Sequence, residues 1–235
     1  MIKVENIDVW GFDHAIRGMR NPMNSWDKSD SHYCKDVSED SPTCLKCEYY
    51  GDCNYNMCIE YYVGKNDLEL MRNLYKVSLT GNHAHRKYLR QIFVSMDITA
   101  PLYWWKEADT YKIGTVANSC STMHTIHKKE FELNDFSHEH LLYTGEGDNP
   151  IDYIIGILNL YRKRYIETKN KEYWWQLIQL LPSSYNQKRT VTMNYENVVT
   201  IIHQREGHRL DEWNEFCEVL KSLPYINEIT KEDEA

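Results

Sequence analysis

The stretch that decides the fold is Ile92-Phe93-Val94-Ser95-Met96-Asp97-Ile98, followed closely by Pro101-Leu102-Tyr103-Trp104-Trp105. Apolar residues occupy every second position from Ile92 to Ile98, and their neighbours are more polar from Ser95 on, as in a half-buried strand. Proline is tolerated in the first turn of a helix, so Pro101 predicts a helix that continues to Ala108. The sequence therefore predicts a sheet strand joined to a short helix.

Upstream of this stretch, residues 2–9 alternate loosely and predict a first strand. Residues 12–19 predict a short amphipathic helix, which Asn21-Pro22 ends. Asn66 is expected to cap another helix, with apolar residues at helical spacing between 68 and 75.

Downstream, Asn149-Pro150 predicts the start of a long amphipathic helix that reaches Tyr165. A second helix stops at Pro182, and Asn194 is expected to cap a third that ends at Gly207. A last helix should carry the apolar residues between 210 and 220. The residues indicate an α+β fold with a sheet early in the chain and helices late.

Composition narrows the class of protein. The 235 residues are 42% hydrophobic and 26% charged, which fits a single globular domain over residues 1–235 with one insertion at 24–60. A net charge of −8 provides no overall positive field for nucleic acid, so small phosphorylated ligands are better candidates. The sequence has neither a membrane-length apolar run of ~20 residues nor a secretory start, so we expect a cytoplasmic protein.

The insertion at residues 24–60 is rich in cysteine and lacks a hydrophobic face. In a reducing compartment its thiols are candidates for a structural zinc site or an iron–sulfur cluster, with one cysteine to spare. Spacing of this kind without histidines is only moderately specific, so simple packing is an equal alternative. The candidate ligands are Cys34, Cys44, Cys47, Cys53 and Cys58.

Two groups of polar residues flank the central strand and helix. His83 and His85 precede the strand, and in an extended chain both would face one side, although two solvated histidines on a surface turn is the plainer reading. Residues 110–122 read as a loop able to hold a phosphate and a pyrimidine, or as nothing more than a loop. Its candidate residues are Lys112, Thr115, Ser119, Cys120 and Ser121.

Cys120 stands apart from the cysteine-rich insertion. A thiolate can add to C6 of a pyrimidine and so activate C5, whereas a free cysteine is otherwise commonly a buried packing residue. Near the end of the chain, Asn194 and Arg205 share one helix face, with His208 just beyond. Arg205 can contact a phosphate or a base carbonyl, and the alternative is a solvated arginine at a helix end.

Across residues 66–225 the chain resembles the flavin-dependent thymidylate synthases. His83-Ala84-His85 is similar to the His-x-His of that family, and Pro101-Leu102-Tyr103 to the start of its next helix. Leu181-Pro182, Asn194, Arg205 and His208 fall at similar spacings. The resemblance implies a central antiparallel sheet packed with helices and a helical C-terminal half.

The family signature, Arg-His-Arg-x-x-Ser-x-Asn-Glu-x-Ser-x-Arg-Tyr, should cover residues 110–123, but none of its named residues is identical here. Lys112 keeps a positive charge, Thr115 keeps a hydroxyl, and Cys120 replaces a serine. This rewritten segment is where the chain departs most from the family.

The resemblance implies a homotetramer whose active sites hold FAD, dUMP and methylenetetrahydrofolate, with NADPH as reductant. It implies flavin-site roles for His83, His85 and Asn194, with Lys112 and His208 as further cofactor-binding candidates, and nucleotide binding by Arg205. Two alternatives remain open. One is C5 hydroxymethylation of the nucleotide, and the other is a non-catalytic binding or scaffold protein on the same fold.

Overall fold

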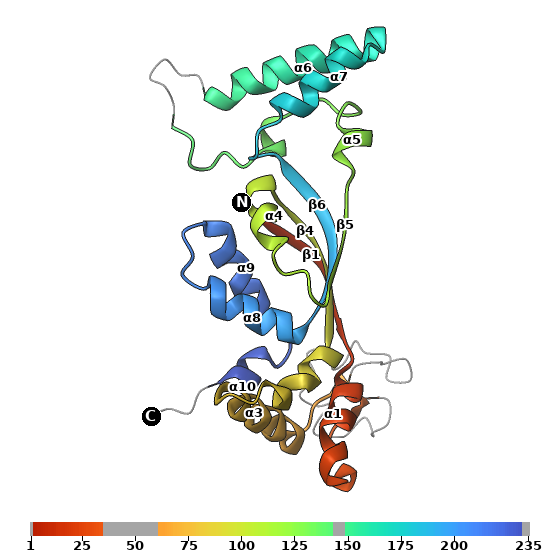
Figure 1. Ribbon diagram of the computed structural model, residues 1–235, viewed down its shortest axis with the longest axis vertical. Coiled ribbons are helices and arrows are strands. Elements are labelled where there is room, and N and C mark those ends of the chain that lie inside the picture. The colour runs from red at the N-terminus through yellow and green to blue at the C-terminus, as the bar shows by residue number, and fades with distance from the viewer. Residues whose placement is uncertain (1, 35–60, 143–148, 232–235) are drawn as a thin grey trace, which may run out of the picture. The chain divides into compact units, whose positions relative to one another are not determined.

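A computed structural model of the protein describes residues 2–34, 61–142 and 149–231. A four-stranded antiparallel sheet has the strand order β1 (Lys3–Trp10), β4 (Phe93–Pro101), β6 (Asn186–Asn194) and β5 (Thr115–Ser119) (Figure 1). The alternation seen in the sequence matches the burial of β4, because Val94, Met96 and Ile98 are at most 1% exposed. A second, two-stranded sheet pairs β2 (His32–Tyr33) with β3 (Tyr61–Tyr62).

Strands β5 and β6 of the four-stranded sheet were not expected from the sequence, and neither were β2 and β3. Residues 110–122 are not simply a loop, because they include the edge strand β5 and lead into the short helix α5 (Thr122–Thr125). Strand β6 lies between β4 and β5 although it comes late in the chain. The sheet is therefore built from both halves of the sequence.

The predicted helices are present, with one wrong cap. Asn149 and Asn194 accept hydrogen bonds from the backbone N–H groups of Ile151 (3.2 Å) and Asn197 (3.0 Å), which confirms both as caps. Asn66 does not cap its helix, since the helix starts one residue earlier. The Asp30 carboxylate accepts from the Asn66 and Asp67 N–H groups instead. Besides α5, the described α-helices are α1 (Phe12–Arg20), α3 (Lys65–Leu79), α4 (Leu102–Ala108), α6 (Pro150–Thr168), α7 (Lys171–Leu180), α8 (Tyr195–Arg205), α9 (Asp211–Lys221) and α10 (Ile226–Thr230).

The chain divides into two compact units. Unit 1 comprises Met1–Ile7, Ser95–Thr192 and Arg205–Cys217. Within it, the Trp104 ring of α4 packs against Trp213 (4.6 Å between centroids) and Phe216 (5.3 Å) of α9. Helices α6 and α7 form a hairpin over a separate apolar cluster (Figure 1). That cluster contains Ile126, Phe131, Phe136, Ile151, Leu158 and Leu177.

Unit 2 comprises Asp8–Val94, Met193–Gln204 and Glu218–Ala235. Phe12 of α1 makes edge-on ring contacts with Tyr195 and Tyr225, at 5.6 and 5.2 Å between centroids. The buried Arg20 guanidinium pairs with the fully buried Asp67 carboxylate at 2.5 Å. An aromatic cluster and a buried ion pair thus organise this unit.

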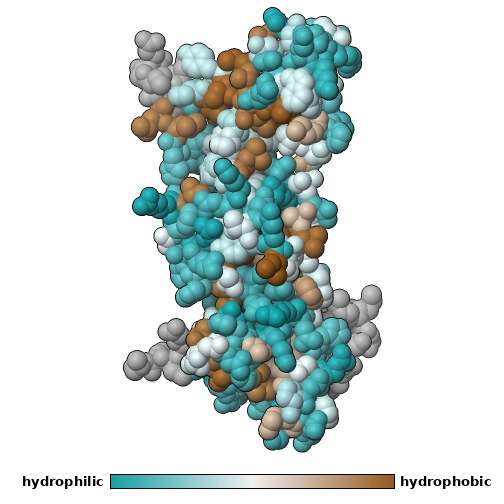
Figure 2. All heavy atoms as spheres, viewed as in Figure 1, coloured by the Kyte–Doolittle hydropathy of each residue, from teal (hydrophilic) through white to brown (hydrophobic). Residues whose placement is uncertain are grey.

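The surface carries apolar side chains over the α6–α7 hairpin (Figure 2), where Tyr153, Ile157 and Leu160 are all at least 46% exposed. Across the described residues, every helix is too short or too polar to cross a lipid bilayer.

Candidate functional site

The strongest candidate site is built around Arg205, the last residue of α8. Its Nε donates to the Tyr111 hydroxyl at 2.9 Å, and its Nη1 donates to the Glu107 carboxylate at 2.7 Å. Glu107 lies on α4, and Tyr111 follows that helix at the start of the rewritten segment. The rewritten segment and the helix-end arginine therefore meet.

Aromatic rings hold the Arg205 guanidinium in place. Its central carbon lies 4.6 Å from the centroid of the Trp213 ring and 5.5 Å from that of Tyr111. The Trp213 indole N–H also donates to Glu107, at 3.0 Å. The ring contacts and the shared carboxylate fix the guanidinium in one orientation, which is the arrangement needed for a planar, bidentate contact.

His208 completes this cluster, and its backbone contacts define its tautomer. The Leu210 N–H donates to Nδ1 at 3.2 Å, so the neutral ring carries its proton on Nε2. Nε2 lies 3.6 Å from Glu107 Oε2 and 3.1 Å from Arg205 Nη1. Glu107 is therefore the acceptor around which Arg205, Trp213 and His208 gather.

One donor of this cluster remains available. Within the described part of the chain, Arg205 Nη2 makes no hydrogen bond, and the side chain is 18% exposed. An oriented guanidinium with an unused N–H pair can bind a carbonyl or phosphate oxygen of a ligand. Glu107, which already offsets the positive charge, favours an uncharged carbonyl edge over a second full negative charge.

Comparison with solved structures finds this fold in the flavin-dependent thymidylate synthase ThyX from Helicobacter pylori, complexed with FAD and dUMP. The TM-score is 0.62 at 16% identity, over 98% of each chain. A second structure from that organism with FAD and dUMP has a TM-score of 0.61 at 14% identity, over 99% of this chain and 98% of that chain. The chain has the ThyX fold.

The UMP/dUMP methylase PolB from Streptomyces cacaoi, bound with 5-Br dUMP, has a TM-score of 0.53 at 14% identity, covering 94% of this chain and 89% of that chain. No family model matches this sequence, and no curated protein sequence matches it. The similarity to ThyX is therefore established at the level of the fold, where it confirms the expected architecture.

The rewritten segment of this ThyX fold is largely exposed. Lys112, Ser119 and Cys120 are exposed, while Thr115 and Ser121 are half-buried. Ser121 caps α5, where its hydroxyl accepts from the His124 N–H at 3.3 Å. Tyr111, which the sequence did not single out, is the residue of this segment that contacts Arg205.

Cys120 is exposed, which rules out the alternative of a buried packing cysteine. Its backbone N–H donates to the Lys188 carbonyl at 2.9 Å, and the Gln187 side chain donates to the Cys120 carbonyl at 3.0 Å. The cation that strand pairing brings beside it is therefore Lys188. The Lys188 ammonium itself contacts Asp97 at 3.1 Å.

His83 and His85 are both exposed, but the chain there is not extended as predicted. It forms the 3-10 helix η5 (His83–Gln91), in which residues two apart point in different directions because a turn takes three residues. The neighbouring Arg86 and Arg90 both pair with Glu196. Neither imidazole has a side-chain partner within the described residues, so both remain accessible to a ligand.

A second arginine, which stacks on a tryptophan of α4, was missed by the sequence analysis. Arg189 of β6 lies over the Trp105 ring at 4.2 Å, and its Nη1 donates to Asp109 at 2.7 Å. Trp105 in turn donates its indole N–H to the Gln187 carbonyl at 2.8 Å. Trp105 of α4 therefore packs against Arg189. The neighbouring Trp104 packs against Trp213, which in turn contacts Arg205.

Tyr103, at the start of α4, belongs to a polar cluster nearby in sequence. Its hydroxyl donates to Glu212 and contacts the Ser137 hydroxyl at 3.0 Å. Burial and the hydrogen bond to the Glu212 carboxylate raise the pKa of Tyr103 well above its ordinary value. Tyr103 is therefore a neutral hydrogen-bond donor at physiological pH.

The described residues include only part of the cysteine-rich insertion. Cys34 is buried, whereas Cys44, Cys47, Cys53 and Cys58 lie outside the described residues. Among residues 2–34, 61–142 and 149–231, no group of three or more histidine, cysteine, aspartate or glutamate residues is arranged to hold a metal.

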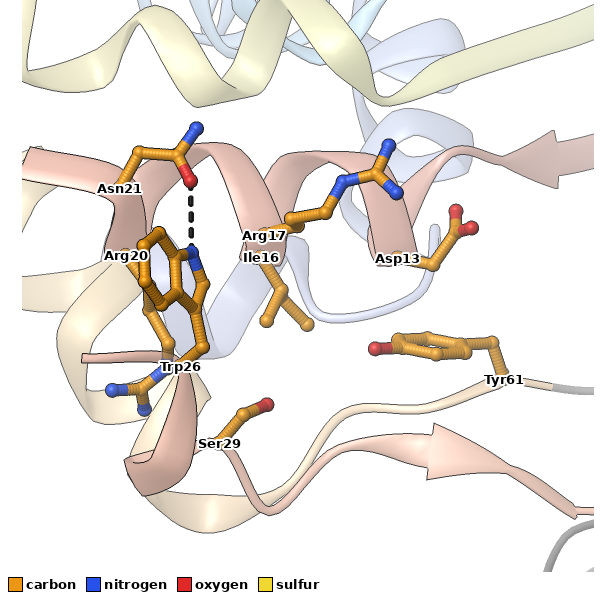
Figure 3. A pocket seen from close by; sticks show the side chains of 8 residues that line it. All are labelled: Asp13, Ile16, Arg17, Arg20, Asn21, Trp26, Ser29 and Tyr61. Atoms are coloured by element: carbon orange, nitrogen blue, oxygen red, sulfur yellow. Dashed lines mark hydrogen bonds between the residues drawn. The ribbon is translucent and has the colours of Figure 1, made fainter. Parts of the chain in front are cut away.

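Unit 2 has a surface hollow of about 500 Å³ that the sequence analysis did not anticipate (Figure 3). Trp26, fixed by a 2.8 Å hydrogen bond from its N–H to Asn21, and Tyr61 face it with Asp13 and Arg17. Burial, helped by the charges of Asp67 and Asp13, raises the pKa of Tyr61 to about 12. None of the residues that line this hollow was predicted from the sequence as a site residue.

Proposed function

We propose that this chain binds a pyrimidine nucleoside monophosphate of the dUMP type and transfers a one-carbon group to C5. The observation that carries the proposal is the convergence of Arg205 and Tyr111, from two distant parts of the sequence, in a fold shared with proteins solved with dUMP or 5-Br dUMP. Flavin-dependent methylation to dTMP is the form of this reaction that the family resemblance favours.

Arg205 would bind the base. Its unused Nη2 and its fixed plane suit a carbonyl oxygen of a uracil ring, and Glu107 would keep the guanidinium in that plane. Tyr111 and Trp213 would hold the guanidinium by their ring faces, while His208, whose Nε2 lies 3.6 Å from the Glu107 carboxylate, would lie beside the pair. The substrate's phosphate would bind near the hydroxyls of Thr115, Ser119 and Ser121.

The residues proposed for FAD fit a phosphate-bearing group by their chemistry. Lys112, His83 and His85 are exposed, and their side chains have no acidic partner within the described residues. Asn194 uses its side-chain oxygen to cap α8, which leaves its amide N–H groups to serve as donors. When bound, the flavin would supply the hydride that completes the methyl group, with NADPH as reductant and methylenetetrahydrofolate as one-carbon donor.

Cys120 is the proposed nucleophile. Its thiolate would form a bond to C6 of the pyrimidine, which moves an electron pair to C5 so that C5 can bond to the one-carbon group as that group leaves its donor. When C5 then loses its proton, the C6–S bond breaks and the thiolate is released. Exposure leaves the thiol accessible to a ligand. A Cys120→Ser protein with unaltered turnover would remove this role.

The test compares Arg205 with Arg209, an exposed arginine four residues later in the sequence. Arg205→Ala should abolish dUMP binding in calorimetry, whereas Arg209→Ala should leave it unchanged, because Arg209 is exposed and outside the cluster. Visible absorption of the purified protein reports bound flavin. Product mass after incubation with dUMP, methylenetetrahydrofolate, FAD and NADPH separates a methyl from a hydroxymethyl product.

The scaffold alternative has one observation in its favour, which is that Glu107 already neutralises Arg205 within the chain. A colourless protein that does not bind dUMP in its wild-type form would support the scaffold and overturn the enzyme. If Arg205→Ala binds dUMP as tightly as the wild type, the role proposed for Arg205 is wrong.

A further inference from the structure

A second surface hollow, of about 370 Å³, lies in unit 1 beside the α6–α7 hairpin. Four basic side chains, His124, His127, Lys169 and Lys171, line it together with the Tyr165 and Trp174 rings. No carboxylate lines it, although the chain as a whole has a net charge of −8. None of its residues belongs to the proposed nucleotide site.

The positive charge in this hollow is uncompensated. Within the described residues, the ammonium groups of Lys169 and Lys171 have no acidic partner, and each lies instead over an aromatic ring. Lys169 is 5.9 Å from the centroid of Tyr165, and Lys171 is 5.8 Å from that of Trp175. Cations without a nearby carboxylate are available to an anion from solution.

His127 shows the same shortage of acceptors. Its Nδ1 is buried and has no hydrogen-bond partner within the described residues, while its ring makes an edge-on contact with Tyr165 at 5.1 Å. Burial, and then the charges of Lys128, Lys169 and Arg162, lower the pKa of His127. A bound anion would offset the field of these three cations.

The local backbone is fixed, so the hollow is a stable feature of the hairpin. Arg162 donates from Nε to the His127 carbonyl at 3.1 Å, which ties α6 to the segment after α5. Lys169 ends α6 in the left-handed conformation (φ 57°), and Asn170 caps α7 through the Glu172 N–H at 2.9 Å. Two lysines on either side of a tight turn are thereby held on the same hollow as Trp174.

We propose that this hollow binds the phosphate group of an aromatic phosphate monoester, such as a nucleoside monophosphate, with Trp174 supporting the ring. The two lysines and His124 contact the phosphate oxygens. The half-buried Trp174 ring offers a flat apolar surface for the base. The site is independent of the proposed transfer reaction.

The experiment measures AMP, adenosine and inorganic phosphate binding by calorimetry in the Arg205→Ala background, so that the proposed dUMP site does not contribute. AMP should bind saturably, adenosine should not, and inorganic phosphate should bind more weakly and compete with AMP. Lys169→Gln/Lys171→Gln should weaken AMP binding at least about tenfold, since two charged contacts are lost. Lys28→Gln/Lys87→Gln removes the same charge from exposed positions elsewhere and should change nothing.

Trp174→Leu distinguishes recognition of the base from recognition of the phosphate. It should weaken AMP binding and leave the binding of inorganic phosphate unchanged. The proposal is overturned if AMP does not bind, if adenosine binds equally well, or if both lysine pairs behave alike. If inorganic phosphate binds as tightly as AMP, the proposed contact between Trp174 and the base is wrong, and the hollow is a site for the free ion.

Discussion

Asp67 is a carboxylate with no exposed side-chain surface, and it collects hydrogen bonds from several directions. One oxygen accepts from Arg20, and the other accepts from the Ser29 and Ser31 hydroxyls at 2.6 and 2.7 Å. The backbone N–H groups of Asp30 and Ser31 contact the same oxygen at 3.2 Å. The loop before β2 is therefore held to α3 by one side chain.

We expect Asp67→Asn to lower the free energy of unfolding by about 3 kcal/mol, because it leaves the Arg20 charge buried without its partner. Urea unfolding followed by circular dichroism measures this. Asp152→Asn, at an exposed position on α6, is the control and should lie within about 0.5 kcal/mol of wild type. An equal effect of both substitutions would contradict the assigned role.

The contribution of Asp67 to the free energy of unfolding should depend on pH. Burial alone would raise the pKa of Asp67, but Ser29, Ser31 and Arg20 together outweigh burial and lower it from 3.8. A lowered pKa in the folded state means that this stabilisation is complete above pH 3.8 and is lost as the pH falls further. The stability difference between wild type and Asp67→Asn should therefore shrink in acid, and a constant difference would count against it.

Glu107 accepts hydrogen bonds from both Arg205 and Trp213. Glu107→Leu should cost about 1–3 kcal/mol in the free energy of unfolding, because the Trp213 N–H and the Arg205 guanidinium both lose their acceptor. Glu107→Gln keeps an oxygen and should cost less. Thermal or urea unfolding of both, with the exposed Glu130→Leu as control, tests the order.

At the scale of elements, the α6–α7 hairpin offers a matched pair of leucines. Leu177 is fully buried in the hairpin cluster, whereas Leu180 of the same helix is 45% exposed. Leu177→Ala should cost about 2–5 kcal/mol through lost burial and the cavity left behind. Leu180→Ala should cost under about 1 kcal/mol, and similar losses for both in urea unfolding would refute the packing described.

Elements with strong local signals were predictable from the sequence, and those defined by pairing were not. Asn149 and Asn194 cap their helices as expected, and the alternation in β4 matches its burial. Strand β6 was missed because its first residues, 186–190, are polar and only Val191 and Met193 are buried apolar residues. Its place depends on the strands on either side, which no local pattern reveals.

For the candidate site, the sequence indicated Arg205 and His208, which the structure brings together. It did not indicate Glu107, Tyr111 or Trp213, because their contacts span up to about a hundred residues and carry no fixed spacing. The site is therefore a product of tertiary packing between α4 and the residues around α8 and α9.

At the scale of the whole molecule, the family resemblance implies that several subunits contribute to the proposed flavin site. We expect light scattering at micromolar concentration to give a mass near four chains. A mass of one chain at every concentration would contradict this assembly and with it the proposed arrangement of the flavin site.

Strand β5 is the edge of the sheet, and every one of its residues after Thr115 is exposed. A segment that contributes so little to the core can be replaced almost entirely without cost to folding. This accounts for a chain that keeps the ThyX architecture while its signature has changed beyond recognition. Substitutions along this edge strand would therefore change the surface chemistry of the molecule far more than its stability.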